Sequence, residues 1–163
     1  MRVAVLSDTH IPLACKSLPE ALLKEIEGVD LIIHAGDLVE LSVLNDLVKI
    51  APVEAVSGNM DSLKSGRSLP RKKILELGGF KIGITHGSGA PQNLICCLQQ
   101  EFANQELDCI IYGHSHLPKI ENIDGTIYFN PGSPTDKVIA PYNSYGILEI
   151  TDKLTPKIVR LKS

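Results

Sequence analysis

The chain has 163 residues, 44% of them hydrophobic and 21% charged, so length and composition predict one globular domain covering residues 1–163. Sixteen Lys and Arg against nineteen Asp and Glu give a formal net charge of -3. This balance excludes a basic surface that attracts nucleic acid or an anionic membrane by charge alone. Because Trp is absent and aromatic residues are only 4%, a stacking platform for single-stranded nucleic acid is not expected either.

The sequence shows no pattern for export or membrane insertion. The apolar residues 3–6 are too few for a signal peptide, and no apolar run approaches the roughly 18 residues of a membrane helix. No two cysteines have C-x-x-C spacing, which favours buried thiols in a reducing compartment over a disulfide framework. We therefore expect a cytoplasmic protein without membrane contact. The cysteines are Cys15, Cys96, Cys97 and Cys109.

The first third of the chain alternates short apolar runs with amphipathic segments, which predicts parallel βαβ units. Ser17 is the expected N-cap of the first helix and Gly28 its stop. The expected strands are residues 3–6, 31–33 and 53–56, and the expected helices are residues 19–26 and 40–50.

The remainder of the chain is richer in strands. Gly78-Gly79 and Asp124-Gly125 predict tight hairpin turns between strands. The fold class is therefore α/β, with mixed sheets and outer helices. The expected strands are residues 71–77, 80–84, 109–112, 119–123, 126–129, 145–150 and 156–161, with one helix at 91–104.

Polar residues follow five of the buried strands directly. In α/β sheets the carboxyl ends of the strands line the ligand crevice, so these side chains are expected to converge. The candidate donors are Asp8, His10, Asp37, Asn59, His86, His114 and His116.

Each of these positions also has a simpler interpretation. A single Asp at a strand end is usually a helix cap or turn former, and Gly58-Asn59 is a common turn pair. His34 is expected to be structural rather than a ligand. The clustering of four of the five histidines in these loops, however, favours a metal site.

The donor set contains oxygen and imidazole nitrogen but no thiolate. Such ligands suit Mn, Fe, Zn or Mg in five- or six-coordinate geometry. Seven donors exceed the needs of one ion, so a shared carboxylate between two ions roughly 3.5–4 Å apart is expected.

Five short segments contain the candidate donors in a fixed order. They are Asp8-Thr9-His10, Gly36-Asp37, Gly58-Asn59, His86-Gly87 and Gly113-His114-Ser115-His116. These segments resemble the motifs of the calcineurin-like metallophosphoesterases, which run D-x-H, G-D, G-N-H-D/E, G-H and G-H-x-H. The order of elements and residues 130–134, Asn-Pro-Gly-Ser-Pro, are similar to the small YfcE-type phosphodiesterase branch. The resemblance implies a four-layer α-β-β-α sandwich of two mixed sheets.

The resemblance also implies a role for each donor. Asp37 bridges the two ions, and Asp37, Asn59 and His114 are expected in catalysis, with Asn59 and His114 also contacting substrate. Mn²⁺ is the first choice of metal, with Ni²⁺, Fe²⁺, Zn²⁺ and Mg²⁺ as alternatives. The first ion is implied at Asp8, His10 and His116, and the second at Asn59, His86 and His114.

The implied activity is hydrolysis of a small phosphoester, most of all a phosphodiester, by a metal-bridging hydroxide. Met60 stands where the wider family has a histidine after Gly58-Asn59, and a thioether has no proton to give a leaving group. A non-catalytic interaction scaffold, like the retromer subunit of this fold, is the alternative. A serine hydrolase and a P-loop NTPase are excluded because neither motif is present.

The sequence identifies neither the physiological substrate nor the oligomeric state, so a homo-oligomer is compatible with it. Only residues 62–71 and 130–134 are available as substrate loops. Arg67 and Arg71 could meet a phosphate, although an exposed surface role is the simpler expectation for both.

Overall fold

A computed structural model of the chain describes residues 1–61 and 69–162. Two five-stranded mixed sheets form the centre, in the orders β10-β9-β1-β2-β3 and β4-β5-β6-β8-β7. The described residues also form three α-helices and one short 3-10 helix. The elements in chain order are β1 Arg2–Leu6, α1 Glu20–Glu25, β2 Leu31–His34, α2 Ser42–Leu47, β3 Val53–Ala55, β4 Lys72–Leu77, β5 Phe80–Thr85, η1 Pro91–Asn93, α4 Leu94–Glu101, β6 Cys109–Ile111, β7 Lys119–Ile123, β8 Thr126–Asn130, β9 Ser144–Ile150 and β10 Leu154–Arg160.

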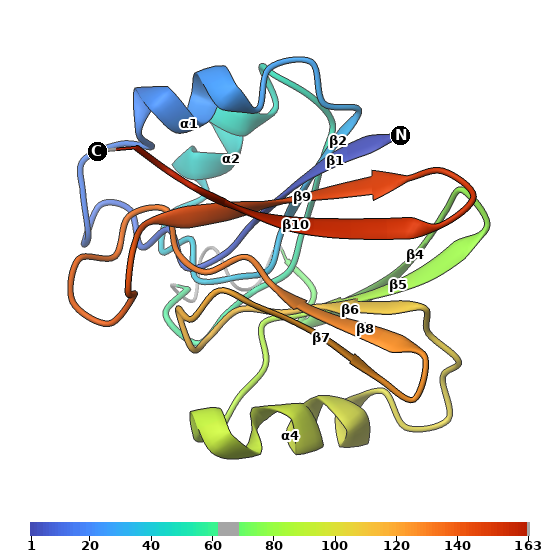
Figure 1. The fold of residues 1–163 in the computed structure, drawn as a ribbon. Helices are drawn as coiled ribbons and strands as arrows, with labels where there is room; N and C mark the ends of the chain where they lie inside the picture. The colour runs from blue at the N-terminus through green and yellow to red at the C-terminus, as the bar shows by residue number, and fades with distance from the viewer. Residues whose placement is uncertain (62–68, 163) are drawn as a thin grey trace.

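The layers follow from which face of each strand is apolar. In β1, Val3 and Val5 pack between the two sheets, whereas Ala4 and Leu6 point to the other face, against α1 and α2. This is the period of two that strands impose on their side chains. Figure 1 shows α1 and α2 covering one sheet and α4 lying beyond the other. The molecule is thus the four-layer α-β-β-α sandwich that the family resemblance implied.

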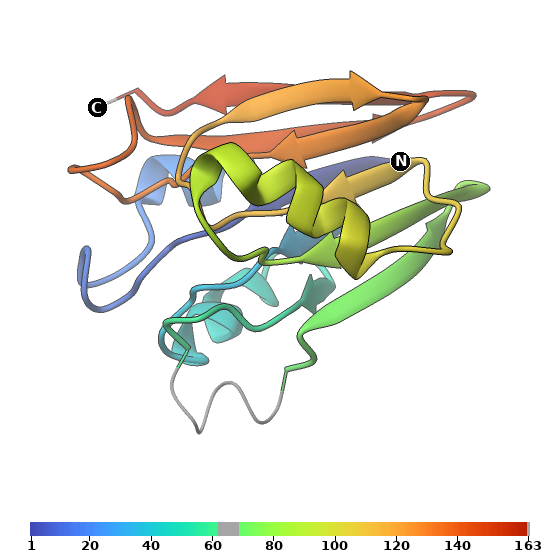
Figure 2. The same ribbon diagram turned by 90° about the horizontal axis from the view of Figure 1, so that it is seen from below.

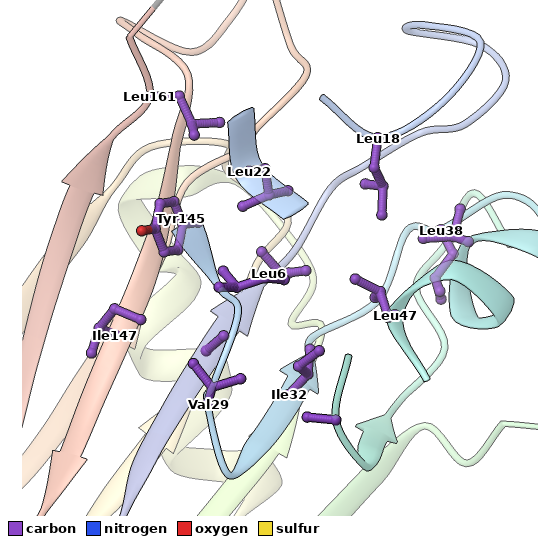
Figure 3. Close-up of a cluster of buried hydrophobic side chains, with 14 of the residues drawn as sticks. Leu6, Leu18, Leu22, Val29, Ile32, Leu38, Leu47, Tyr145, Ile147 and Leu161 are labelled. Atoms are coloured by element: carbon purple, nitrogen blue, oxygen red, sulfur yellow. The ribbon is translucent and has the colours of Figure 1, made fainter. Parts of the chain in front are cut away.

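Three apolar clusters hold these layers together. Leu22 of α1 and Leu47 of α2 pack on Leu6 and Ile32 in the cluster of Figure 3. A second cluster fills the space between the sheets, with Phe129 as its largest fully buried side chain. The third cluster lies between α4 and its sheet, and α4 lies in front of the strands in Figure 2, where the molecule is seen from below.

Pairing within the first sheet confirms the expected parallel units and adds a long-range partner. β1 pairs with β2, and β2 with β3, in parallel. On its other side β1 pairs antiparallel with β9, from near the end of the chain. The Gly78-Gly79 turn of the second sheet is also confirmed, since both glycines have positive φ (59° and 86°), as a tight hairpin of this type requires.

Several expected boundaries were wrong. The N-cap of α1 is Pro19, without a side-chain capping bond, so Ser17 does not cap this helix. The expected helix at 91–104 begins as a 3-10 turn, and α4 itself covers only Leu94–Glu101.

Of the four free cysteines Cys109 is buried but Cys96 is exposed, so the expectation of buried thiols fails for Cys96. Among the described residues, no helix has the length and apolarity needed to cross a membrane.

Candidate metal centre

Five loops at the carboxyl ends of β1, β2, β3, β5 and β6 bring the candidate donors together. The backbone of these loops is unusual, because five of the seven donors have a left-handed conformation, with φ between 45° and 70°. Such a conformation costs a non-glycine residue about 1–3 kcal/mol and is concentrated at functional sites. The left-handed donors are Asp8, His10, Asp37, His114 and His116.

Asp8, His10 and His116 form what we call the first ligand cluster. Their candidate ligand atoms all lie within 4.8 Å of one another. The two imidazole Nε2 atoms are 3.2 Å apart, and His116 Nε2 is 3.4 Å from Asp8 Oδ1. Ligand bonds near 2.1 Å place neighbouring donors of one ion about 3 Å apart, so this spacing fits a shared cation.

The second ring nitrogen of His116 is held from behind by a carboxylate. Its Nδ1 lies 2.6 Å from Asp136 Oδ2. Asp136 also accepts backbone N–H groups from Val138, Ile139 and Ala140. Burial would raise the pKa of Asp136, but these N–H groups and His116 lower it to about 2. An ionised carboxylate on Nδ1 fixes the tautomer that leaves the Nε2 lone pair facing the first ligand cluster.

Asn59, His86 and His114 form the second ligand cluster. His114 Nδ1 lies 3.1 Å from Asn59 Oδ1, and the rings of His86 and His114 meet edge to face with centroids 5.3 Å apart. Backbone carbonyls orient both rings, because His86 Nδ1 is 2.8 Å from the oxygen of Ala35 and His114 Nε2 is 2.9 Å from that of Gly89. The donors implied for the second ion therefore lie side by side.

Asp37 lies between the two clusters. Its Oδ1 accepts the backbone N–H of Met60 at 2.7 Å. The other oxygen, Oδ2, is 3.5 Å from His10 Nε2 and 3.3 Å from His86 Nε2. Asp8 Oδ1 is 3.9 Å from each of the same two nitrogens. Two carboxylates, those of Asp37 and Asp8, thus face both clusters. The family resemblance implied a bridging position for Asp37 alone.

The charges at this centre are buried and mutually dependent. Burial raises the pKa of Asp8 above its ordinary value, although His86 and His116 oppose that effect. Burial alone would raise the pKa of Asp37, but the hydrogen bond and the charge of His86 lower it below its ordinary value. Burial alone would lower the pKa of His86, but the carboxylates of Asp37 and Asp8 raise it to about 9.

This arrangement fits divalent cations. Two buried carboxylates need positive charge nearby, because burying an unpaired carboxylate is costly. The buried Nε2 of His86 has no hydrogen-bond partner among the described residues, and it faces Asp37 and Asp8. A cation bound there would neutralise the carboxylates and take the place of the proton that the raised pKa otherwise keeps on His86.

The family model of the calcineurin-like phosphoesterase superfamily domain matches residues 1–153. The chain belongs to this superfamily. A probable metallophosphoesterase of Methanothermobacter thermautotrophicus is 38% identical over 162 residues, which cover 98% of this chain and 92% of the relative. The activity of the family is metal-dependent hydrolysis of phosphoesters, and this chain is therefore a metallophosphoesterase by descent.

Solved structures agree with the superfamily fold. An archaeal protein described as a novel phosphodiesterase matches with a TM-score of 0.78 at 26% identity, covering 99% of this chain and all of that one. Vps29 of Entamoeba histolytica, solved with Zn²⁺, matches with a TM-score of 0.77 at 24% identity over 98% of this chain and 99% of that one. The second likeness concerns the fold alone.

Two glycines of the calcineurin-like motifs have a steric explanation. A Cβ on Gly58 would collide with the backbone nitrogen and the carboxylate of Asp37. A Cβ on Gly113 would lie 2.7 Å from Asp8 Oδ2. Glycine therefore lets each loop approach the carboxylate of another strand.

Sequence reasoning missed the residues that support the donors from behind. Asp61 accepts backbone N–H groups of Gly58 at 2.6 Å, Val39 at 2.7 Å and Asp37 at 3.2 Å. Its position in the G-N-H-D/E motif could have indicated a role. Asp136 carries no comparable signal, because its partner His116 is 20 positions away in the chain.

Two further expectations concern residues near the centre. His34 is structural, as expected: it is fully buried, and its Nε2 lies 3.1 Å from Thr9 Oγ1. Burial lowers the pKa of His34 to about 3, so the ring is neutral. Arg67, named as a residue that could meet phosphate, lies outside the described residues.

Proposed function

We propose that this metallophosphoesterase hydrolyses phosphodiesters in preference to monoesters, with two divalent cations held by its two ligand clusters. The observation that carries the proposal is the position of Asp37, whose Oδ2 lies within 3.5 Å of a histidine from each cluster. A carboxylate between two sets of imidazoles fits a pair of cations better than a single one.

The proposed ligands of the first ion are Asp8, His10 and His116, and those of the second are Asn59, His86 and His114, with Asp37 shared. When bound, the two cations supply an activated water molecule and positive charge for the phosphate oxygens. Mn²⁺ is proposed as the metal because the donors are all oxygen and nitrogen, which also suit its neighbours in the first transition row.

The residues of the chain position the reacting groups. Met60 fixes Asp37 Oδ1 through its backbone N–H, which leaves Oδ2 directed at the clusters. Asp8 is fixed in the same way, since both its oxygens accept the backbone N–H of His114, at 3.1 and 3.2 Å. The proposed catalytic groups are Asp37, Asn59 and His114, and the exposed Asn59 also faces incoming substrate.

The preference for diesters is supported by the archaeal relative described as a phosphodiesterase. A non-catalytic scaffold on the same fold is less well supported. Such a protein does not need a complete set of donors, and this chain has a competent donor at each of the seven positions.

The experiment is hydrolysis of bis(4-nitrophenyl) phosphate by protein freed of metal with a chelator and reloaded with one divalent ion at a time. We expect activity only after reloading, highest with Mn²⁺ or a neighbouring transition metal. 4-Nitrophenyl phosphate tests the preference for diesters. Full activity in excess chelator, with loss of metal verified by elemental analysis, contradicts the proposed mechanism, and a faster monoester reaction contradicts the preference.

A further inference from the structure

An apolar hollow lies beside the first ligand cluster. It has a volume of about 370 Å³ and is lined by His10 and His116 together with Leu13, Lys137 and Val138. Leu13 is 66% exposed and Val138 91% exposed, although both side chains are large and apolar. Exposed apolar groups that adjoin candidate metal ligands are placed to bind an apolar part of a substrate. The ammonium of Lys137 and the carboxylate of Asp136 also line this hollow, at its charged edge.

A polar hollow lies beside the second ligand cluster. Its volume is about 630 Å³, and Asn59 and His86 line it together with Ser88, Gln100 and Arg71. Hydroxyl, amide and guanidinium groups offer hydrogen-bond donors and acceptors for a hydroxylated molecule. The two hollows therefore differ in chemistry and adjoin different ends of the same centre.

A phosphodiester has two alcohol arms that diverge from a tetrahedral phosphorus. When the phosphorus lies at the two clusters, the arms are directed away from it on different sides. Arg71 and Lys137, one in each hollow, offer hydrogen-bond donors to an anionic diester, and each hollow also contains one carboxylate, Glu101 and Asp136 respectively. A monoester has a single arm and leaves one of the hollows unfilled.

We propose that the substrates are phosphodiesters with unlike arms: an apolar aryl or alkyl alcohol against Leu13 and Val138, and a polyhydroxy alcohol beside Arg71 and Gln100. This inference rests on the phosphoesterase function proposed above and adds the class of substrate. Hydrolysis adds water across one P–O bond, so the oxygen of water joins phosphorus and one alcohol leaves with a proton. The products are that alcohol and a monoester of the other.

The polar hollow is tested with two diesters that share a 4-nitrophenyl arm, one with methyl and one with glyceryl as the second arm. The leaving group is the same, so a difference in KM reports the second arm. We expect the glyceryl ester to have a KM lower by roughly tenfold, the value of one or two hydrogen bonds to a charged group. Arg71→Gln should remove this advantage. Lys24→Gln, a matched change on α1 outside both hollows, should keep it.

The apolar hollow is tested with Val138→Asp, which places a charge where the aryl arm is proposed to lie. We expect the KM of both nitrophenyl esters to rise by roughly tenfold or more, because the ring loses its apolar contact and meets a negative charge. Val48→Asp is the matched control, since Val48 is also exposed but follows α2, outside both hollows. In metal-free protein, 4-nitrophenol should shift the methyl NMR signals of Leu13 and Val138.

The outcomes separate this inference from the function on which it rests. Hydrolysis of both esters with equal KM, unchanged by Val138→Asp, overturns the proposal of unlike arms while phosphodiesterase activity stands. The same holds if 4-nitrophenol shifts methyl signals elsewhere and not those of Leu13 and Val138. Failure to hydrolyse any ester with any divalent ion, while 4-nitrophenol still shifts these two residues, overturns the phosphoesterase function itself.

Discussion

The first and second ligand clusters are supported in different ways. In the first cluster, His116 is held by the carboxylate of Asp136. In the second cluster, His86 and His114 are held by neutral backbone carbonyls, and the amide of Asn59 is exposed. A charged partner on a ligating imidazole raises its basicity, whereas a neutral carbonyl does so less. From this comparison we expect the first cluster to have the higher affinity for a divalent cation.

The largest effect is expected where the two clusters meet. Asp37→Ala removes the nearer of the two carboxylates that face both clusters, so activity on an aryl diester should fall by about 10³-fold or more. Asp37→Asn should also lose most activity, because it removes the negative charge. It keeps the shape of the side chain and an oxygen that can accept the Met60 N–H, so it separates the charge from the shape. Both variants are measured by kcat/KM and by bound metal, with circular dichroism to verify folding.

Lys153→Ala, an exposed lysine in the turn after β9, is the control for Asp37→Ala. Arg67→Ala, the comparison that the sequence suggests, lies outside the described residues. Equal and mild effects of the Asp37 and Lys153 changes, in folded proteins, would show that the centre has been placed wrongly.

The difference between the clusters is tested through Asp136. Asp136→Ala should weaken the tighter of two metal-binding steps by about 10- to 100-fold, because it releases Nδ1 of His116. Asp136→Asn should fall between this variant and the parent, since its amide oxygen still accepts a hydrogen bond. Calorimetric titration with Mn²⁺ resolves the two steps. Asp152→Ala, in an exposed turn, is the matched control, and equal weakening of both steps contradicts the assignment of Asp136 to the first cluster alone.

A smaller effect on the rate is expected from Met60→His, a change beside Asn59 of the second cluster. The side chain of Met60 is 47% exposed, and its link to Asp37 is through the backbone, so Met60→His should leave that link intact. The parent should show a steep dependence of rate on leaving-group pKa, because a thioether gives no proton. The variant should flatten this dependence by raising rates on alkyl diesters by roughly tenfold or more. This gain is smaller than the usual contribution of a general acid, about 10²–10⁴-fold, because the new imidazole is not placed by the fold for this task.

The measurement is kcat/KM across a series of diesters with leaving groups of increasing pKa. Met60→Gln, similar in length but without an acidic proton at neutral pH, is the control. A shallow slope in the parent would mean that another residue already protonates the leaving group.

His34 provides an effect on stability rather than on activity. Its pKa is about 3 in the fold and ordinarily 6.5, so the unfolded state takes up a proton below pH 6.5 that the native state does not. The free energy of unfolding should therefore fall as the pH drops from 6.5 towards 3, by up to about 1.4 kcal/mol per pH unit from this group. The loss is absent above pH 6.5.

His34→Gln should flatten that dependence by about one proton, because glutamine does not titrate in this range. Urea unfolding in chelator at several pH values measures it for both proteins. Parallel curves of stability against pH would show that His34 is not buried in its neutral form.

Apolar runs such as residues 3–6 predicted the buried strands and the mixed α/β class, whereas the four layers were implied by the family resemblance. The donors were found for a similar reason: polar residues immediately after apolar strands share one edge of a sheet. The sequence did not predict that β9 pairs with β1, since antiparallel pairing across more than 130 positions leaves no local pattern. It also missed Asp136, because hydrogen bonds between distant loops depend on the folded shape and not on spacing.

The loop that carries Asp8 is completed by residues made much later. Ser133 donates its hydroxyl to the carbonyl of Asp8 at 2.7 Å, and Thr135 donates to that of Thr9 at 2.7 Å, across 125 and 126 positions. During synthesis on the ribosome, a nascent chain that has emerged only through β6 has neither these bonds nor the β9 neighbour of β1. Such distant pairings form slowly, because a long loop must close before they contribute. We therefore expect the candidate donor set to take its final arrangement only at the end of biosynthesis, after nearly the whole polypeptide has left the ribosome.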